Sequence, residues 1–307
     1  MSKTGSSSTV SPARTYRLHD HTVTAPALTG GLHLVATPIG NLRDITLRAL
    51  ETLAAADVIA CEDTRITRRL VDHYGIATPL TPYHEHNAQE ARPALLRQLA
   101  DGRTIALVSD AGTPLISDPG YKLVREACAA GHTVTAVPGA SAVLTALSLA
   151  ALPTDRFLFD GFLPPKQAAR QKRAQELARI PATIVLFETG PRIADALADL
   201  ATAFGTREAA ICRELTKLHE EIRRGDLAAL AQAYADGAET RGEFVVVIAP
   251  PADEDVASSD DVDALLSAAL ARLSVKDAVA EVATATGQKR REIYQRALEL
   301  TRASGDA

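Results

Sequence analysis

Short apolar runs alternate with segments of helical periodicity between residues 32 and 149, and this alternation constrains the fold more than any other feature. Each run is four or five residues long, the length of a buried strand. We predict strands at residues 32–36, 58–61, 105–108 and 133–137, and helices near residues 45–55, 64–73, 88–100, 118–129 and 140–150. Strands that alternate with helices form βαβ units, so this half should build a parallel sheet.

A second α/β unit is predicted after Pro153. Its strands are expected near residues 157–160, 183–187, 208–212 and 244–248, and its helices around residues 167–179, 191–203 and 226–235. Because a helix does not follow every strand, we expect a mixed sheet. Three short helices are predicted at residues 262–273, 275–284 and 289–303. The expected organisation is a flexible tail (1–29), an N-terminal α/β domain (30–151), a second α/β domain (152–250), an acidic linker (251–260) and a C-terminal helical module (261–307).

Composition argues against several classes of protein. No apolar stretch reaches the length of a membrane span, and the Ser/Thr-rich N-terminus lacks the apolar segment of a secretory signal. The three cysteines, Cys61, Cys128 and Cys212, are far apart, which favours neither a disulfide framework nor a CxxC metal site. These features fit a reducing cytoplasm. The net charge of −5 argues against a uniformly basic nucleic-acid binder but allows local basic patches.

The segment at residues 108–120 (VSDAGTPLISDPG) is the strongest candidate for a ligand site. It follows a predicted strand, and open α/β sheets bind ligands at the carboxyl ends of their strands. Gly112 lets the backbone approach a ligand, and Asp110 can accept hydrogen bonds from an amine or a ribose hydroxyl. We expect a helix to begin at Asp118 as N-cap, with Pro119 at its first position. The alternative is a tight turn without a ligand.

Five further motifs occur in the same chain: LVATPIGN (34–41), EDTR (62–65), HEHN (84–87), VPGASA (137–142) and RELTK (213–217). Together with residues 108–120, they resemble the ribosomal RNA small subunit methyltransferase I group within the tetrapyrrole methylase superfamily. The resemblance covers about residues 31 to 302 and rests on the ensemble, because each motif alone is weak. It implies a two-domain α/β tetrapyrrole-methylase-like (class III methyltransferase) fold with a small C-terminal helical module.

The resemblance also implies an activity and a cofactor. Members of this group transfer a methyl group from S-adenosylmethionine to the 2′-hydroxyl of a cytidine in 16S ribosomal RNA of the small subunit. The resemblance also suggests that this chain forms a homodimer. The family binds the cofactor folded between its two domains, mainly through backbone contacts. Carried over to this chain, the cofactor residues are Pro38, Asp110, Gly112, Thr113, Leu115, Ser141, Ala142, Phe187, Leu215 and Val246. Ser141 can instead be a plain helix cap.

Two departures from known patterns matter. The loop at residues 37–41 (TPIGN) has a proline where nicotinamide-binding and class-one methyltransferase loops have a glycine, so a Rossmann dinucleotide site is not expected. Where the family often has a histidine before an arginine, this chain reads Gly190-Pro191-Arg192. An essential histidine at that place is therefore not expected, while Arg192 remains a substrate or structural contact.

Proton transfer from a ribose hydroxyl requires an acceptor, and the candidates are His84, His86, Glu62 and Asn87. We expect a strand ending at Tyr83 that presents His84 and His86 on one face. The alternatives are hydrogen-bonded loop residues, or a metal site for which no third ligand at suitable spacing is present. EDTR can equally be a structural ion pair that involves Arg65.

Basic residues suited to phosphate contacts occur in five places: Arg65, Lys166, Arg192, Arg213, Lys217, Lys289, Arg290 and Arg291. Lys166 belongs to a cluster with Arg170, Lys172 and Arg173, whose plain interpretation is a solvated helix face. The KRR run at residues 289–291 opens the last predicted helix and resembles a helix-turn-helix recognition element, with a solvated cap as the alternative. Two rival functions remain, a tetrapyrrole C-methyltransferase and a non-catalytic RNA-binding assembly protein.

Overall fold

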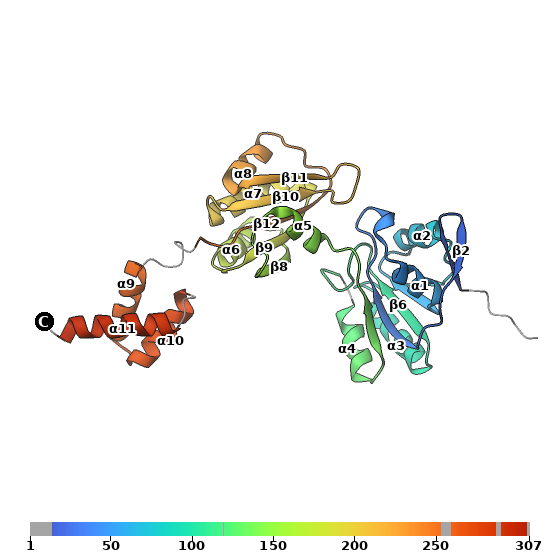
Figure 1. Ribbon diagram of the computed structural model, residues 1–307, viewed down its shortest axis with the longest axis horizontal. Coiled ribbons are helices and arrows are strands. Elements are labelled where there is room, and N and C mark those ends of the chain that lie inside the picture. The colour runs from blue at the N-terminus through green and yellow to red at the C-terminus, as the bar shows by residue number, and fades with distance from the viewer. Residues whose placement is uncertain (1–13, 119, 253–258, 287–289, 306–307) are drawn as a thin grey trace, which may run out of the picture. The chain divides into compact units, whose positions relative to one another are not determined.

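The computed structural model describes residues 14–118, 120–252, 259–286 and 290–305, and the chain divides into two compact units (Figure 1). Unit 1 comprises Met1–Thr145 and Glu214–Glu221, and unit 2 comprises Ala146–Arg213 and Ile222–Ala307. The boundary therefore falls inside a helix, a few residues before the expected boundary at residue 151. Most of the RELTK motif belongs to unit 1.

Unit 1 contains a five-stranded parallel sheet in the order β5-β4-β6-β3-β7. Its strands are β3 (Gly31–Val35), β4 (Val58–Cys61), β5 (Leu80–Pro82), β6 (Thr104–Val108) and β7 (Val134–Val137). Its helices are η1 (Leu42–Asp44), α1 (Leu47–Ala55), α2 (Thr64–His73), α3 (Ala88–Ala100), α4 (Tyr121–Ala129) and the start of α5 (Ala142–Ala150). The predicted parallel sheet is confirmed.

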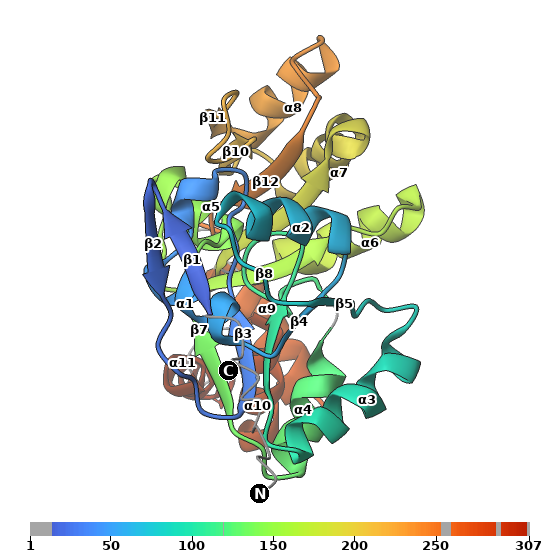
Figure 2. The ribbon, with the colours of Figure 1, turned by 90° about the vertical axis from the view of Figure 1, so that its right-hand side faces the viewer.

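Helices cover both faces of this sheet (Figure 2). Successive side chains of a strand point to opposite faces, so Ala106 and Val108 pack with α1 and α2, whereas Ile105 and Leu107 pack with α3 and α4. All five residues of β6 are buried. The near-continuous apolar strands read from the sequence are thus explained by two cores, one on each face.

The expected flexible tail over residues 1–29 is wrong for residues 14–25. Strands β1 (Thr15–Leu18) and β2 (His21–Thr24) pair as an antiparallel hairpin. Tyr16 is 3% exposed and packs in the core on the α1 and α2 face. The Arg14 guanidinium pairs with Asp57 at 2.5 Å. Burial of an aromatic ring and this ion pair hold a segment whose composition resembles a tail.

Helix α4 begins later than expected. Its N-cap is Gly120, with a φ of 136°, and not Asp118. Pro119, expected at the first helical position, lies outside the described residues. The Asp118 carboxyl instead lies beside Ser109, whose side chain acts to lower its pKa. The aspartate is therefore part of the loop after β6.

Unit 2 contains a mixed sheet in the order β11-β10-β12-β9-β8, as predicted. Its strands are β8 (Phe157–Phe162), β9 (Thr183–Thr189), β10 (Glu208–Arg213), β11 (Glu221–Asp226) and β12 (Glu243–Ile248). Helices α6 (Gln167–Ala178), α7 (Ile193–Phe204) and α8 (Leu227–Ala235) pack on one face, and η2 spans Gly190–Arg192. Strand β11 was missed, because its sequence EIRRGD has no apolar alternation.

The C-terminal part of unit 2 forms a three-helix module with its own apolar core, which confirms the predicted module. Its helices are α9 (Ser259–Leu270), α10 (Val275–Thr286) and α11 (Arg290–Gly305). Most of the expected acidic linker, residues 253–258, lies outside the described residues. Among the described helices, none combines the length and apolar character required to span a bilayer.

Candidate active site

The loops after β3 and β6 meet at a topological switch point of the unit 1 sheet. The two strands are neighbours, but the connection from β3 leads past β6 to β4, whereas that from β6 leads past β3 to β7. The helices α1 and α4 in these connections lie on opposite faces. Thr37 and Gly112 join the two loops through reciprocal backbone hydrogen bonds of 2.9 and 3.0 Å. Open α/β sheets bind ligands at such a point, so the geometry supports the ligand site predicted after β6.

The backbone of the loop after β6 is unusually constrained. Leu115 and Ser117 have φ values of 75° and 63°, in the left-handed region that non-glycine residues rarely adopt. Gly112 has a φ of 77°, and an ideal Cβ there would lie 3.3 Å from Ile39 Cγ2. Strained backbone of this kind concentrates at ligand sites. A glycine is thus needed where the two loops approach each other.

Carboxylates gather at the ends of β4 and β6. Asp110 Oδ1 accepts a hydrogen bond from the Asp63 backbone N–H at 2.9 Å. Burial raises the pKa of Asp110, and burial likewise raises the pKa of Asp118, with the Asp110 charge adding to it. Burial, then the charges of Asp110 and Asp118, raise the pKa of Glu62. The site therefore holds three partly buried carboxylates, and burial and like charges raise their pKa values more than nearby groups lower them.

Asp63 has a different role from its neighbours. Its carboxylate accepts hydrogen bonds from the Arg65 guanidinium at 2.6 to 3.1 Å, and Arg65 holds the pKa of Asp63 down at about 2. The carboxylate also caps α2. The structural ion pair considered for EDTR is therefore present as Asp63 with Arg65. The Arg65 side chain is 88% exposed, so it can still meet a phosphate.

Ser141 lies at the start of α5 and acts as a helix cap, with its Oγ accepting a hydrogen bond from the Leu144 N–H at 3.4 Å. Thr113 Oγ1 donates to the Ala140 carbonyl at 3.2 Å, which ties the loop after β6 to the loop after β7. The structure thus brings seven of the ten cofactor residues implied by the resemblance to one edge of one sheet: Pro38, Asp110, Gly112, Thr113, Leu115, Ser141 and Ala142.

The expected arrangement of the histidine pair is wrong. Strand β5 ends at Pro82, and residues 84–87 form a turn before α3, so His84 and His86 do not share a strand face. Their ring centroids lie 6.1 Å apart. Asn87 Oδ1 accepts from the His84 N–H at 2.8 Å, and its amide donates to the Pro82 carbonyl at 3.0 Å. The Asn87 side chain thereby stabilises the turn, whereas the buried Nδ1 of the His84 ring has no hydrogen-bond partner among the described residues.

The RELTK loop packs against the loop after β3 inside unit 1. An ideal Cβ on Gly40 would overlap the aliphatic stem of Lys217. Lys217 Nζ pairs with Glu214 Oε1 at 2.8 Å, and the lysine side chain is 27% exposed. Leu215 is buried at 5% exposure, with its neighbours Glu214 and Thr216 both at positive φ. Lys217 therefore has internal contacts and only a partly exposed side chain for RNA.

The two cofactor candidates in unit 2 differ in accessibility. Phe187 is half-buried, and its ring packs edge-on against those of Phe159 and Phe162 at 4.7 and 5.7 Å. Val246 is 1% exposed within the core formed with α6, α7 and α8. The side chain of Val246 therefore has almost no surface for a ligand, because it fills the apolar layer between sheet and helices.

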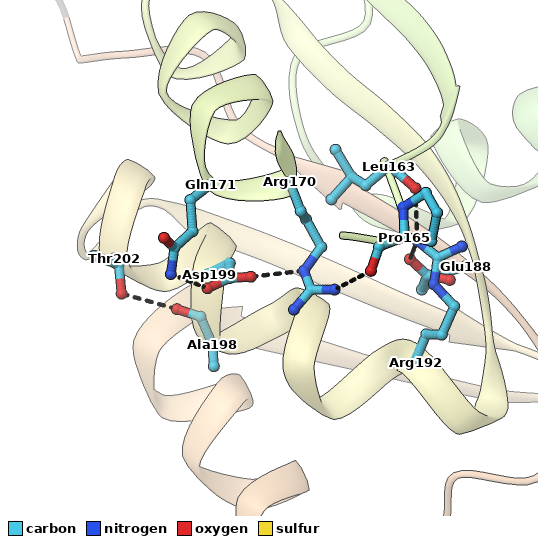
Figure 3. Close-up of polar contacts among 9 residues, drawn as sticks. All are labelled: Leu163, Pro165, Arg170, Gln171, Glu188, Arg192, Ala198, Asp199 and Thr202. Carbon is cyan, nitrogen blue, oxygen red and sulfur yellow. Dashed lines mark hydrogen bonds and ion pairs between the residues drawn. The ribbon is translucent and has the colours of Figure 1, made fainter. Parts of the chain in front are cut away.

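Arg192 has an internal role in unit 2 (Figure 3). Its guanidinium donates to the Leu163 carbonyl at 2.5 Å and lies 3.2 Å from Glu188 Oε2. Glu188 is 3% exposed, so the arginine compensates a buried carboxylate. This geometry favours the structural alternative for Arg192.

The basic cluster at the start of α6 is dispersed by folding. Arg170 is 5% exposed and pairs with Asp199 at 2.6 Å (Figure 3). Arg173 pairs with Asp160 and Glu176. Lys166 remains exposed at the N-cap of α6. The two arginines are therefore paired with carboxylates of the same unit, and Lys166 and Lys172 are the exposed cations of this cluster.

The remaining basic candidates lie on two elements. Arg213 ends β10 and donates to the Arg241 carbonyl at 3.1 Å. Arg290 and Arg291 begin α11 with exposed side chains. Lys289, the first residue of the KRR run, lies outside the described residues.

Sequence reasoning missed the role of Asp118, which was assigned to helix capping. The signal was the pair of aspartates in one loop after a buried strand.

Within residues 14–118, 120–252, 259–286 and 290–305, no three His, Cys, Asp or Glu side chains are placed to hold a metal ion.

Comparison with known proteins identifies the family. Residues 31–231 match the tetrapyrrole (corrin/porphyrin) methylases, and residues 256–301 match the RsmI C-terminal HTH domain. A ribosomal RNA small subunit methyltransferase I from Mesorhizobium japonicum is 50% identical over 92% of this chain and 97% of its own length. The chain belongs to the ribosomal RNA small subunit methyltransferase I group of tetrapyrrole methylases.

Other members of the family are consistent with this assignment. The protein of the same name from Xylella fastidiosa strain Temecula1 is 47% identical over 86% of this chain and 98% of its own length. Among solved tetrapyrrole methylases, a Thermus thermophilus uroporphyrin-III C-methyl transferase complexed with S-adenyl homocysteine aligns with a TM-score of 0.50 at 19% identity. It covers 72% of this chain and 97% of its own. That distant likeness supports the tetrapyrrole-methylase fold alone.

Proposed function

We propose that this chain transfers a methyl group from S-adenosylmethionine to the ribose 2′-hydroxyl of a cytidine in 16S ribosomal RNA of the small subunit. The observation that carries the proposal is the 50% identity to a ribosomal RNA small subunit methyltransferase I over 97% of that protein's length. Likeness to tetrapyrrole methyltransferases is far weaker, at 17–22% identity in the structures compared. The target nucleotide follows from the family resemblance.

The unit 1 switch point fits the cofactor. Its carboxylates are acceptors for the amine and ribose hydroxyls of an adenosine, and the positive charge of a sulfonium suits a cluster of acids. Gly112 permits close approach of the backbone. The first turn of α5 offers backbone N–H groups to a carboxylate. We assign cofactor binding to Asp110, Gly112, Thr113 and the residues around Ser141.

S-adenosylmethionine, when bound, supplies a methyl group on a positively charged sulfur. The protein must hold the ribose oxygen in line with that group and accept the hydroxyl proton. Glu62 is our first candidate for proton acceptance, because its raised pKa brings it closer to the working pH. His84 is the second, since the turn that carries it follows β5 directly beside the end of β4.

Further parts of the proposal concern partners and compartment. We place RNA contacts on Arg65 and on Arg290 and Arg291, whose guanidinium groups are exposed. Three free cysteines fit a reducing cytoplasm. The family resemblance suggests a homodimer.

The test is transfer of a labelled methyl group by the full chain. Small ribosomal subunits from cells that lack this modification should accept label, and a uroporphyrinogen substrate should not. Label on the tetrapyrrole alone would overturn the proposal in favour of a C-methyltransferase. Absence of cofactor binding would favour a non-catalytic RNA-binding protein.

A further inference from the structure

Tyr121 is an exposed aromatic residue beside the switch-point loop. It is the first residue of α4, and 65% of its surface is exposed. The Arg125 guanidinium lies 5.7 Å from the centre of its ring, one helical turn further on. Arg125 and the adjacent Lys122 are also exposed. An aromatic ring thus lies in contact with one cation and next in sequence to another at the surface.

The constrained loop fixes where this ring is presented. An ideal Cβ on Gly120 would lie only 2.5 Å from Leu115 Cδ2, so the start of α4 closes onto the loop through a glycine. Leu115 itself has a φ of 75°. The backbone that carries Asp110 and Asp118 therefore also determines the position of Tyr121.

Folding of α4 does not depend on this ring. The inner face of the helix is held by Leu123 and Ala127, both fully buried. An ion pair of 2.9 Å between Arg92 and Glu126 joins α4 to α3. The Tyr121 and Arg125 pair adds only a weak contact along the helix surface. A large exposed aromatic side chain is thus left without a structural task.

We propose that Tyr121 and Arg125 form a stacking platform for an unpaired RNA base next to the nucleotide that is methylated, which rests on the proposed function. Sequence-specific recognition of RNA uses unstacked bases that lie on aromatic rings and guanidinium planes. Lys122 and Arg125 supply the positive charge that the flanking phosphates require. Charge and ring chemistry together favour RNA over an uncharged apolar partner.

The experiment compares Tyr121→Ala, Tyr121→Phe and Arg125→Gln in the full chain. The control is Arg97→Gln, an exposed arginine near the end of α3, close to the amino ends of the strands and hence at the opposite edge of the sheet. Binding of short single-stranded RNAs that contain 2-aminopurine reports stacking by fluorescence quenching. Steady-state methylation of small subunits gives KM and kcat for each variant, and calorimetry with S-adenosylmethionine gives its cofactor affinity.

We expect Tyr121→Ala to weaken RNA binding about fivefold to a hundredfold and to remove the quenching, as expected for loss of one stacked base. The KM of this variant for RNA should rise, whereas its kcat and its affinity for the cofactor should stay unchanged. Tyr121→Phe should behave like wild type. The RNA affinity of Arg125→Gln should lie between those of wild type and Tyr121→Ala. If wild type transfers no methyl group to RNA but still binds it through Tyr121, the proposed function fails, and only the stacking of an unpaired RNA base on Tyr121 remains.

Three results would overturn the platform. Wild-type RNA affinity and quenching in Tyr121→Ala would show that no base stacks there. An equal loss in Arg97→Gln would show an effect of charge alone. A change from dimer to monomer in Tyr121→Ala, seen by light scattering, would assign the ring to a second copy of the chain.

Discussion

At the scale of single residues, Asp110 is the acceptor that the cofactor proposal depends on most. Asp110→Asn keeps Oδ1 as acceptor for the Asp63 N–H, so the loop should fold, but it removes the charge. We expect weaker S-adenosylmethionine binding by about 1.5 to 3 kcal/mol, the value of a hydrogen bond to a charged group. Calorimetry measures it, with Asp101→Asn, an exposed acid at the end of α3, as control. An unchanged dissociation constant would place the cofactor elsewhere.

The proposed role of Glu62 predicts how the rate of methyl transfer depends on pH. Only the ionised carboxylate accepts a proton, and its pKa is raised by burial and by Asp110 and Asp118. The single-turnover rate should therefore fall as pH decreases through that raised pKa, at a higher pH than the ordinary value of about 4.3. Glu62→Gln should lower the rate by about 10² to 10⁴ and abolish this dependence, with binding intact. A wild-type rate in Glu62→Gln and a large loss in His84→Ala would transfer the role to the histidine.

The sequence predicts which loop is the candidate ligand site, but it does not predict the roles of individual side chains. Position after a buried strand predicted Asp110 and Gly112, because strand ends are visible in the apolar pattern. The roles of Asn87 and Arg192 were hidden, since each is decided by a carbonyl or a carboxylate that folding brings near it. Polar residues near a site therefore need the structure before a catalytic role can be separated from a structural one.

At the scale of elements, the ion pair that joins α6 to α7 should be important for stability. Arg170 and Asp199 are 6% and 7% exposed in their side chains, and Gln171 also donates to Asp199 at 2.9 Å (Figure 3). Asp199→Ala leaves a buried guanidinium without its partner, so we expect a loss of about 3 to 5 kcal/mol in the free energy of unfolding.

Urea denaturation of Asp199→Ala measures this loss. The double variant Arg170→Met with Asp199→Leu removes both charges and should recover most of it. Thr202→Ala, on the exposed side of α7, is the control. A loss below about 1 kcal/mol for Asp199→Ala would show that the Arg170 and Asp199 ion pair is not important for stability.

Most elements were predictable because their signals are local. Buried strands such as β4 and β6 appear as apolar runs between turns. The hairpin of β1 and β2 was missed although a signal exists, an alternating pattern on each side of a two-residue turn whose His19 has a φ of 54°. Strand β11 has no such signal, and its identity depends on its neighbour β10.

At the scale of the whole molecule, the C-terminal module is expected to hold RNA without affecting the cofactor. It has its own core, which includes Leu266, Val282 and Ile293. Replacing Lys289, Arg290 and Arg291 with glutamine keeps helix propensity and removes three charges. RNA binding should weaken, and the log-log salt slope should flatten by about 0.7 to 0.9 per lost phosphate contact. Unchanged binding across a salt titration would make the module a structural cap.

The central claim is that this chain methylates a ribose oxygen of the small-subunit RNA. The most direct measurement is mass spectrometry of nucleosides from small-subunit RNA after incubation with the full chain and S-adenosylmethionine carrying a deuterated methyl group. We predict deuterated 2′-O-methylcytidine at one position, and a greatly reduced yield with Asp110→Asn at limiting cofactor. A label on a base, a label spread over many nucleotides, or no label in RNA that the chain binds would contradict the account.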